Sequence, residues 1–227
     1  MFYNINFTEL AIGFAILTAS IGIHEASHAF MAYRLGDNTA KYLGRLTLNP
    51  IAHMDPLGSI MILMTMVNGF GIGWGKPTPV NPYNLRNGPK TGMAMVSLAG
   101  PLSNLTLAAF LALPFRLHLL SDPALYSVMH SAIGQWLPDI LGLAVMWNIG
   151  LAAFNIIPLP PLDGFKILQG ILPNRQAYAL SALENYGPAL LLLVIFVGPF
   201  LGINLLWYIM RPIMAFFSLI IVGSSIF

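Results

Sequence analysis

The chain has 227 residues, of which only 8% are charged and 57% are apolar, and its mean hydropathy is +0.75. An average soluble domain is about 25% charged, so a soluble protein of this length could not cover its surface with so few charges. Disordered chains are polar and charged and are excluded as well. The net charge of +2 is too small an excess to indicate nucleic acid binding. The composition predicts a multi-pass protein of the cell membrane.

The first predicted element is a helix from about Thr8 to Tyr33, which is apolar up to Ile23. Four uncharged intervals follow, each as long as the roughly 20 residues that a spanning helix needs. They are 20, 25, 23 and 26 residues long and lie at 56–75, 91–115, 140–162 and 185–210. The last 16 residues, after Arg211, form a shorter candidate. We therefore expect an all-α polytopic membrane protein with about five to six transmembrane helices.

The interval 56–75 differs from the others because its apolar part is short. Glycines and prolines crowd the stretch from Gly69 to Pro82, and at that density they break helices. Non-helical backbone is tolerated at membrane depth where protein or water covers it. The segment near 57–82 is therefore predicted to be re-entrant or β-like.

The basic residues favour re-entry over a further crossing. If 57–75 re-enters, six basic residues fall on one side, and the loop 117–139, which has no Lys or Arg, faces the other. The positive-inside rule makes the basic side cytoplasmic. The six residues are Arg34, Lys41, Arg45, Lys76, Arg86 and Lys90.

No stretch of the chain is long and polar enough to form an added soluble domain. We expect residues 1–227 to form a single integral membrane domain. Its core would be residues 8–170, with additional C-terminal helices at 176–227.

Residues 24–28 read His-Glu-Ala-Ser-His. On a helix His24 and His28 share a face and can bind one ion, and Glu25 next to the first histidine can accept a proton from water. The chain has no cysteine, so a metal site must use His, Asp or Glu. Three ionisable residues in an apolar helix are costly unless they have a function. The alternative is a chance motif whose histidines are satisfied by hydrogen bonds.

A catalytic zinc site needs a third protein ligand, and Asp55 and Asp163 are the candidates by position. Asp163 lies in the sequence Asn-Ile-Ile-Pro-Leu-Pro-Pro-Leu-Asp-Gly, residues 155–164. Its prolines prevent a regular helix, and a broken helix at membrane depth usually lines a site or cavity. The alternative is that Asp163 only caps a following helix at 164–172.

Together these two motifs resemble the site-2 protease family of intramembrane zinc metalloproteases. Segments 44–50, 53–56, 73–82 and 99–104 are similar to segments of its short bacterial members, which lack PDZ or other regulatory domains. The resemblance covers roughly residues 13 to 170.

The resemblance implies one zinc ion per chain, bound by His24, His28 and Asp163. Glu25 would be the general base, and Asn155 would contact the substrate or support the broken helix. The activity implied is a zinc endopeptidase of regulated intramembrane proteolysis, which cleaves within or near transmembrane helices. Its partners would be transmembrane or membrane-anchored substrates and the lipid bilayer, without nucleic acid.

The metal would lie nearer the cytoplasmic side, because His24 precedes Arg34 by ten residues, about 15 Å along a helix. His53 is assigned no catalytic role. An extended chain between Gly69 and Pro82 could pair with an unwound substrate as an added strand, or it could be a plain loop.

Three alternatives belong to other classes. A non-proteolytic membrane metal-binding protein or transporter could use the same His and Asp residues, but it needs no base beside the first ligand. An inactive relative would lack a ligand or the base, and all four residues are present. A different HExxH protease could take a downstream glutamate, and the only later one is Glu184.

Overall fold

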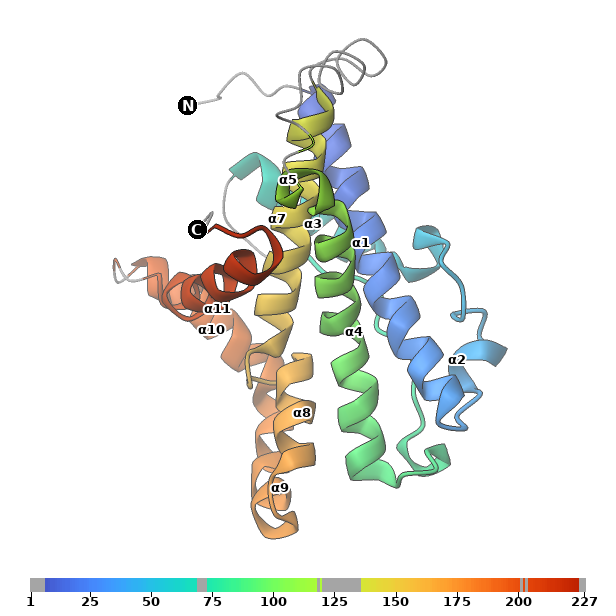
Figure 1. The fold of residues 1–227 in the computed structure, drawn as a ribbon. Coiled ribbons are helices and arrows are strands. Elements are labelled where there is room, and N and C mark those ends of the chain that lie inside the picture. The colour runs from blue at the N-terminus through green and yellow to red at the C-terminus, as the bar shows by residue number, and fades with distance from the viewer. Residues whose placement is uncertain are drawn as a thin grey trace.

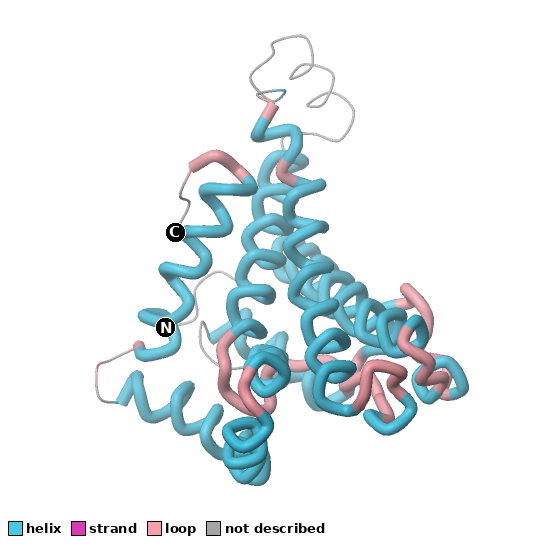
Figure 2. Tube along the Cα trace, turned by 60° about the horizontal axis from the view of Figure 1, so that its bottom comes forward, coloured by secondary structure: helices cyan, strands magenta, loops and turns pink. Residues whose placement is uncertain are grey.

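The computed structural model describes residues 7–68, 73–117, 119, 136–200, 202 and 204–224. In this part of the chain the fold is made of helices and turns, without a β-strand (Figures 1 and 2). The helices are α1 Phe7–Arg34, α2 Thr39–Tyr42, α3 Pro56–Asn68, α4 Pro89–Leu111, α5 Leu113–Arg116, α7 Trp136–Ile156, α8 Asp163–Ile171, α9 Asn174–Ser181, α10 Gly187–Phe200 and α11 Leu205–Ile221. Short 3-10 helices are η1 Pro50–His53, η2 Pro82–Asn84 and η4 Ala182–Tyr186.

Helix α4 lies at the centre of the bundle and packs against α1, α7 and α8 (Figure 1). Small residues make this packing possible: Ala29 and Ala32 of α1, Ala108 of α4, and Ala152 and Ala153 of α7 are fully buried. In a membrane, lipid is as apolar as the helix surface, so close packing of small residues holds helices together. The same close approach brings the polar side chains of α1 within reach of α4.

Four helical stretches of the described chain are long and apolar enough to cross a membrane. They are Phe7–Arg34, Pro89–Leu111, Leu137–Ile156 and Asn174–Phe196, and α3 and α11 are shorter apolar helices. Large apolar side chains such as Leu102 and Phe110 of α4 are exposed, as expected of surfaces that face lipid. The all-α polytopic membrane fold predicted from the composition is confirmed.

The predicted re-entrant segment begins as helix α3 and comes back toward the start of α3 as an extended chain. Residues 73–81 have no regular secondary structure apart from a lone antiparallel bridge between Met54 and Gly75. The Lys76 N–H donates to the His53 carbonyl at 2.8 Å beside this bridge. The chain therefore returns to the point from which α3 departs, whereas a spanning segment would end about 30 Å away.

The C-terminal helices begin and end elsewhere than the charge pattern predicted. The pattern ended one helix at Arg211, whereas α10 ends at Phe200 and α11 carries Arg211 within it. Gly202 has a φ of 71°, and the Asn204 side chain accepts a hydrogen bond from the Trp207 N–H at 3.1 Å. The prediction was wrong because a left-handed glycine and an asparagine N-cap, rather than a charge, set this boundary.

A buried carboxylate, that of Asp37, ties the loop after α1 to the loop before α4. It accepts hydrogen bonds from the Thr39 hydroxyl at 2.6 Å, the Asn81 N–H at 2.8 Å and the Asn84 side chain at 2.9 Å. Burial acts to raise the pKa of the Asp37 carboxyl, but these hydrogen bonds, the Thr39 hydroxyl first, hold the pKa below its usual range. An ionised carboxylate thus fixes the end of the re-entrant region to the loop after α1.

We expect positions 41 and 86 to be accessible from the same side of the membrane, because the Arg86 N–H donates to the Leu35 carbonyl at 2.9 Å, just after α1. The chain has no native cysteine, so Lys41→Cys and Arg86→Cys can be labelled singly with a membrane-impermeant maleimide. Leu119→Cys should be labelled from the other side, since the 23 residues of α4 rise about 35 Å. Labelling of 41 and 86 from opposite sides would show that 57–75 spans.

Candidate metal centre

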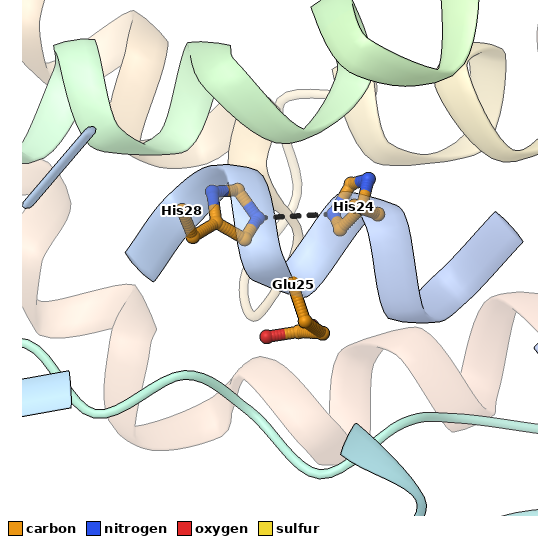
Figure 3. Close-up of side chains that lie close together, drawn as sticks. All are labelled: His24, Glu25 and His28. Atoms are coloured by element: carbon orange, nitrogen blue, oxygen red, sulfur yellow. Dashed lines mark hydrogen bonds between the residues drawn. The ribbon is translucent and has the colours of Figure 1, made fainter. Parts of the chain in front are cut away.

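Two histidines of α1 lie on the face of the helix that is turned toward α4 (Figure 3). The Nε2 atoms of His24 and His28 are 3.0 Å apart, and the ring centroids are 4.6 Å apart. Both side chains are buried. The four-residue spacing brings the two rings together because residues i and i+4 of a helix share a face.

The Nδ1 atoms of both histidines bond to acceptors on α4. His28 Nδ1 lies 2.7 Å from the Val96 carbonyl, and His24 Nδ1 lies 2.6 Å from Asn104 Oδ1. Because these oxygens only accept, each Nδ1 carries a hydrogen, and each Nε2 is the nitrogen turned toward the other histidine and Asp163. This arrangement is the one that metal-binding histidines commonly have.

A buried polar network fixes the Asn104 amide. Its Nδ2 donates to Asn148 Oδ1 at 2.9 Å and to the Ser20 carbonyl at 3.3 Å, which leaves Oδ1 for His24. Asn148 Nδ2 in turn donates to the Ser20 hydroxyl at 2.9 Å. The network joins α1, α4 and α7, and sequence reasoning missed it. Two asparagines inside uncharged helices were the signal, since unpaired amides are costly in a membrane.

Asp163, the first residue of α8, brings its carboxylate to the two histidines. Its Oδ2 lies 3.1 Å from His24 Nε2 and 3.3 Å from His28 Nε2. Beyond these two histidines, this buried oxygen has no hydrogen-bond partner among the described residues. The N-cap of α8 is Leu162, without a side-chain hydrogen bond. The Asp163 carboxylate therefore faces the histidines instead of capping the helix.

The three atoms fit a zinc ion. Ligands about 2.0–2.1 Å from a tetrahedral zinc lie about 3.3–3.4 Å from one another. The separations here are 3.0, 3.1 and 3.3 Å. Two imidazole nitrogens and a carboxylate oxygen that converge in a buried place need positive charge among them, which a proton or a metal ion can supply. Two imidazole nitrogens and one carboxylate oxygen also match the donor set of catalytic zinc, which leaves one position open.

Glu25 extends from the other side of α1, toward the extended segment 73–81 (Figure 3). Its Oε2 accepts the Thr78 N–H at 2.7 Å, and its carbonyl accepts the Thr78 hydroxyl at 2.9 Å. One ligand atom each of His24, Glu25 and His28 lies within 4.8 Å of the others. A single water molecule can bridge such a distance, so the Glu25 carboxylate is within reach of a proton at the centre.

A cavity of about 430 Å³ opens over the metal centre. Its walls include the segment 73–80, and residues 69–72 lie outside the described part of the chain. Asn155 of α7 also lines it, with its Nδ2 donating to the Leu151 carbonyl of the same helix at 2.9 Å. The histidines, Glu25, Asp163 and the extended segment that could pair with a substrate thus all line one cavity.

The other candidate ligands lie elsewhere. Asp55 Oδ1 accepts the Gly58 N–H at 2.7 Å at the start of α3. His53 is buried, and its Nε2 donates to the Thr47 carbonyl at 2.8 Å. Glu184 pairs with Lys166 at 2.6 Å. None of Asp55, His53 and Glu184 lines the metal cavity.

Gly100 of α4 provides the room for the two rings. A Cβ at this position would lie 2.5 Å from His28 Nε2 and 2.6 Å from His24 Cε1. Real Cβ atoms do not approach other atoms so closely. A side chain at position 100 would therefore displace the rings that form the centre.

Comparison with known proteins agrees with a zinc centre at this site. A family model described as peptidase family M50 matches residues 124–198. "Putative zinc metalloprotease YwhC" of Bacillus subtilis is 41% identical over 84% of this chain and 82% of its own length. The chain belongs to peptidase family M50. The resemblance to the site-2 proteases is thereby confirmed, and the protein is a zinc metalloprotease.

More distant members of the family are longer than this chain. "Putative zinc metalloprotease Rip2" of Mycobacterium tuberculosis is 33% identical over 81% of the chain and 65% of its own length. A zinc metalloprotease of Methanocaldococcus jannaschii is 24% identical over 83% of the chain and 43% of its own length. No solved structure matches the chain.

Gly100→Ala should displace the histidine rings and lower zinc affinity by about 10-fold or more. Losing a residue that only orients a metal ligand already costs that much, and here the ligands themselves would move. Zinc content of the purified protein after dialysis against graded chelator measures this. Gly142→Ala of α7 is the control, since among the described residues a Cβ there meets only Phe115, at 3.9 Å. Equal zinc retention in both variants would mean that the rings do not need the space at Gly100.

Proposed function

We propose that this M50 protease is an intramembrane endopeptidase that cleaves within or near transmembrane helices of membrane-protein substrates. The observation that carries the proposal is the approach of Asp163 to His24 and His28, which lie inside a helix long enough to span a membrane. In this proposal these three residues are the zinc ligands and Glu25 is the general base. Residues 8–170 form the catalytic core, and the helices of 176–227 are additions to it.

Zinc, when bound, supplies a Lewis acid that polarises the scissile carbonyl and lowers the pKa of water. The Glu25 carboxylate accepts a proton from the attacking water and passes it to the leaving amine. The Thr78 N–H, 2.7 Å from Glu25 Oε2, holds the carboxylate in place and leaves the other oxygen for the proton. Asn155 lines the same cavity, and its amide oxygen can accept a hydrogen bond from a substrate N–H.

The proposed substrate is an unwound stretch of a membrane helix. A helix satisfies its backbone internally, so its peptide bonds become accessible only when it unwinds. The extended segment 73–80 lines the cavity and can pair with the groups that unwinding frees, as a clamp beside the metal centre. Cleavage of this kind would act in regulated intramembrane proteolysis, with the centre nearer the cytoplasmic side because the basic loops lie beyond the end of α1.

Glu25→Gln and Asp163→Ala separate the base from the ligands. The amide introduced by Glu25→Gln can still accept the Thr78 N–H but cannot take a proton, so this variant should keep about one zinc per chain and lose cleavage by ~100-fold or more. Asp163→Ala removes one of three ligands and should lose most of the zinc. Metal analysis and cleavage of a model membrane peptide in detergent measure both quantities.

Asp55→Ala is the matched control for Asp163→Ala, because Asp55 bonds to the start of α3 outside the metal cavity. The proposed ligand set is wrong if Asp55→Ala loses zinc while Asp163→Ala retains it. Near-normal cleavage by Glu25→Gln would refute the proposed role of the base.

Val80→Pro tests the clamp. Val80 lines the metal cavity, and proline there removes one backbone donor while leaving the metal-binding side chains intact. Zinc content should be unchanged, and cleavage of a helical membrane peptide should fall by about 5-fold, the worth of roughly one hydrogen bond. A short unstructured peptide needs less support and should be affected less. Equal effects on the two peptides would make the segment an ordinary loop.

A further inference from the structure

A second cavity, of about 690 Å³, lies beside the metal cavity and is walled almost entirely by apolar side chains. Helix α7 supplies one wall through a stripe on one face, formed by Met146, Trp147, Gly150, Leu151 and Phe154. Residues of α1, α3, α10 and α11 form the other walls. This volume is enough for several large side chains, and it lies within the range of ligand-binding pockets.

The apolar cavity adjoins the metal cavity. Ile21, Gly73, Leu151 and Phe154 line both of them. Ile21 lies one helical turn before Glu25 on α1, so the shared wall adjoins the proposed base. A chain held in extended form over the metal centre would therefore have the apolar cavity alongside it.

We infer that the apolar cavity is a specificity pocket, which takes large apolar side chains of the substrate next to the scissile bond. The inference rests on the proposed function. Side chains of an extended chain point alternately to its two sides, so one set would enter the cavity while the other faces away from it. The residues of a membrane helix are mostly large and apolar, which matches these walls.

Lipid chains are as apolar as the cavity walls, so selection must come from packing and shape. A large side chain fills the cavity, whereas alanine leaves a void whose lining loses contact atoms. The cavity therefore favours Leu, Met or Phe over Ala at one position of the substrate.

Gly150 is the position at which the pocket can be narrowed without touching the metal centre. A Cβ there meets only the tip of Met214, at 3.8 Å, so a larger side chain has room to enter the cavity. The opposite face of α7 carries Asn148 and Ile149, which are fully buried in the bundle. Gly150→Ala and Gly150→Leu should thus reduce the pocket in two steps.

The test uses the zinc-loaded enzyme in detergent and a set of synthetic 20-residue Leu/Ala peptides, flanked by lysines, in which one position is varied at a time. Wild-type enzyme should cleave peptides with Leu or Phe at one fixed position beside the cut faster than peptides with Ala there. In Gly150→Leu the ratio of Leu-peptide to Ala-peptide cleavage should fall by about 10-fold, as expected for a pocket that loses the room for one side chain. Gly150→Ala should lower the ratio by less.

Gly142→Leu is the matched control, because residue 142 lies on the same helix outside the cavity. In the described part of the chain a Cβ there meets only Phe115, at 3.9 Å. Its ratio should equal that of the wild type, and the zinc content of all variants should be equal. If the ratio is unchanged in Gly150→Leu and the peptides are still cleaved, lipid rather than substrate fills the cavity. This result would overturn the specificity pocket but not the proposed function. If the wild-type enzyme cleaves none of the peptides faster than Glu25→Gln does, both the proposed function and the specificity pocket are wrong.

A binding experiment gives a readout without turnover. In the Glu25→Gln background, a peptide with a photoreactive leucine at the selected position should crosslink to Met210 or Met214 of α11, which line the apolar cavity. Gly150→Leu should abolish these crosslinks, and Gly142→Leu should preserve them. Crosslinks confined to residues outside the cavity would contradict the pocket.

Discussion

Three buried atoms that can bind a metal, His24 Nε2, His28 Nε2 and Asp163 Oδ2, face one another across 3.0 to 3.3 Å. Such an arrangement is unfavourable in an apolar interior unless a cation neutralises it. The bundle must therefore hold these atoms close enough for one cation to lie among them, and each neighbouring element contributes to this. The polar network from Asn104 to Ser20 fixes one ring, and the Val96 carbonyl fixes the other.

Three residues of α4, spaced four positions apart, contact or make room for the histidine pair. Val96, Gly100 and Asn104 lie one turn apart on the face turned to α1. The first and last of them accept hydrogen bonds from the two rings, and the glycine between them leaves the space that the rings occupy. The spacing of the pair on α1 is thus matched by the spacing of its supports on α4.

The sequence was sufficient for the parts of the protein that depend on composition and short motifs. The lack of charge predicted the helical membrane fold, and the spacing of His24 and His28 predicted a shared face. Asp163 was one of two candidates by position, and the resemblance to the site-2 proteases favoured it over Asp55. The sequence could not indicate that Gly100 contacts both rings, because that depends on how closely α1 and α4 approach. The C-terminal boundary was missed for a different reason, since Arg211 lies within α11 and a charge inside a short helix resembles a helix end.

The bridge between Met54 and Gly75 has a consequence for the order of the membrane crossings. Between His28 and Asp163 the chain crosses along α4 and along α7, and an even number of crossings returns it to the side from which it started. If α3 crossed as well, the number would be odd, and Asp163 would arrive at the far side of the bilayer from the histidines. A short excursion that begins and ends at the same depth is therefore a condition for assembling the three donor atoms, although it contributes none of them. An insertion that turned α3 into a crossing would destroy the centre while leaving every donor residue in the sequence.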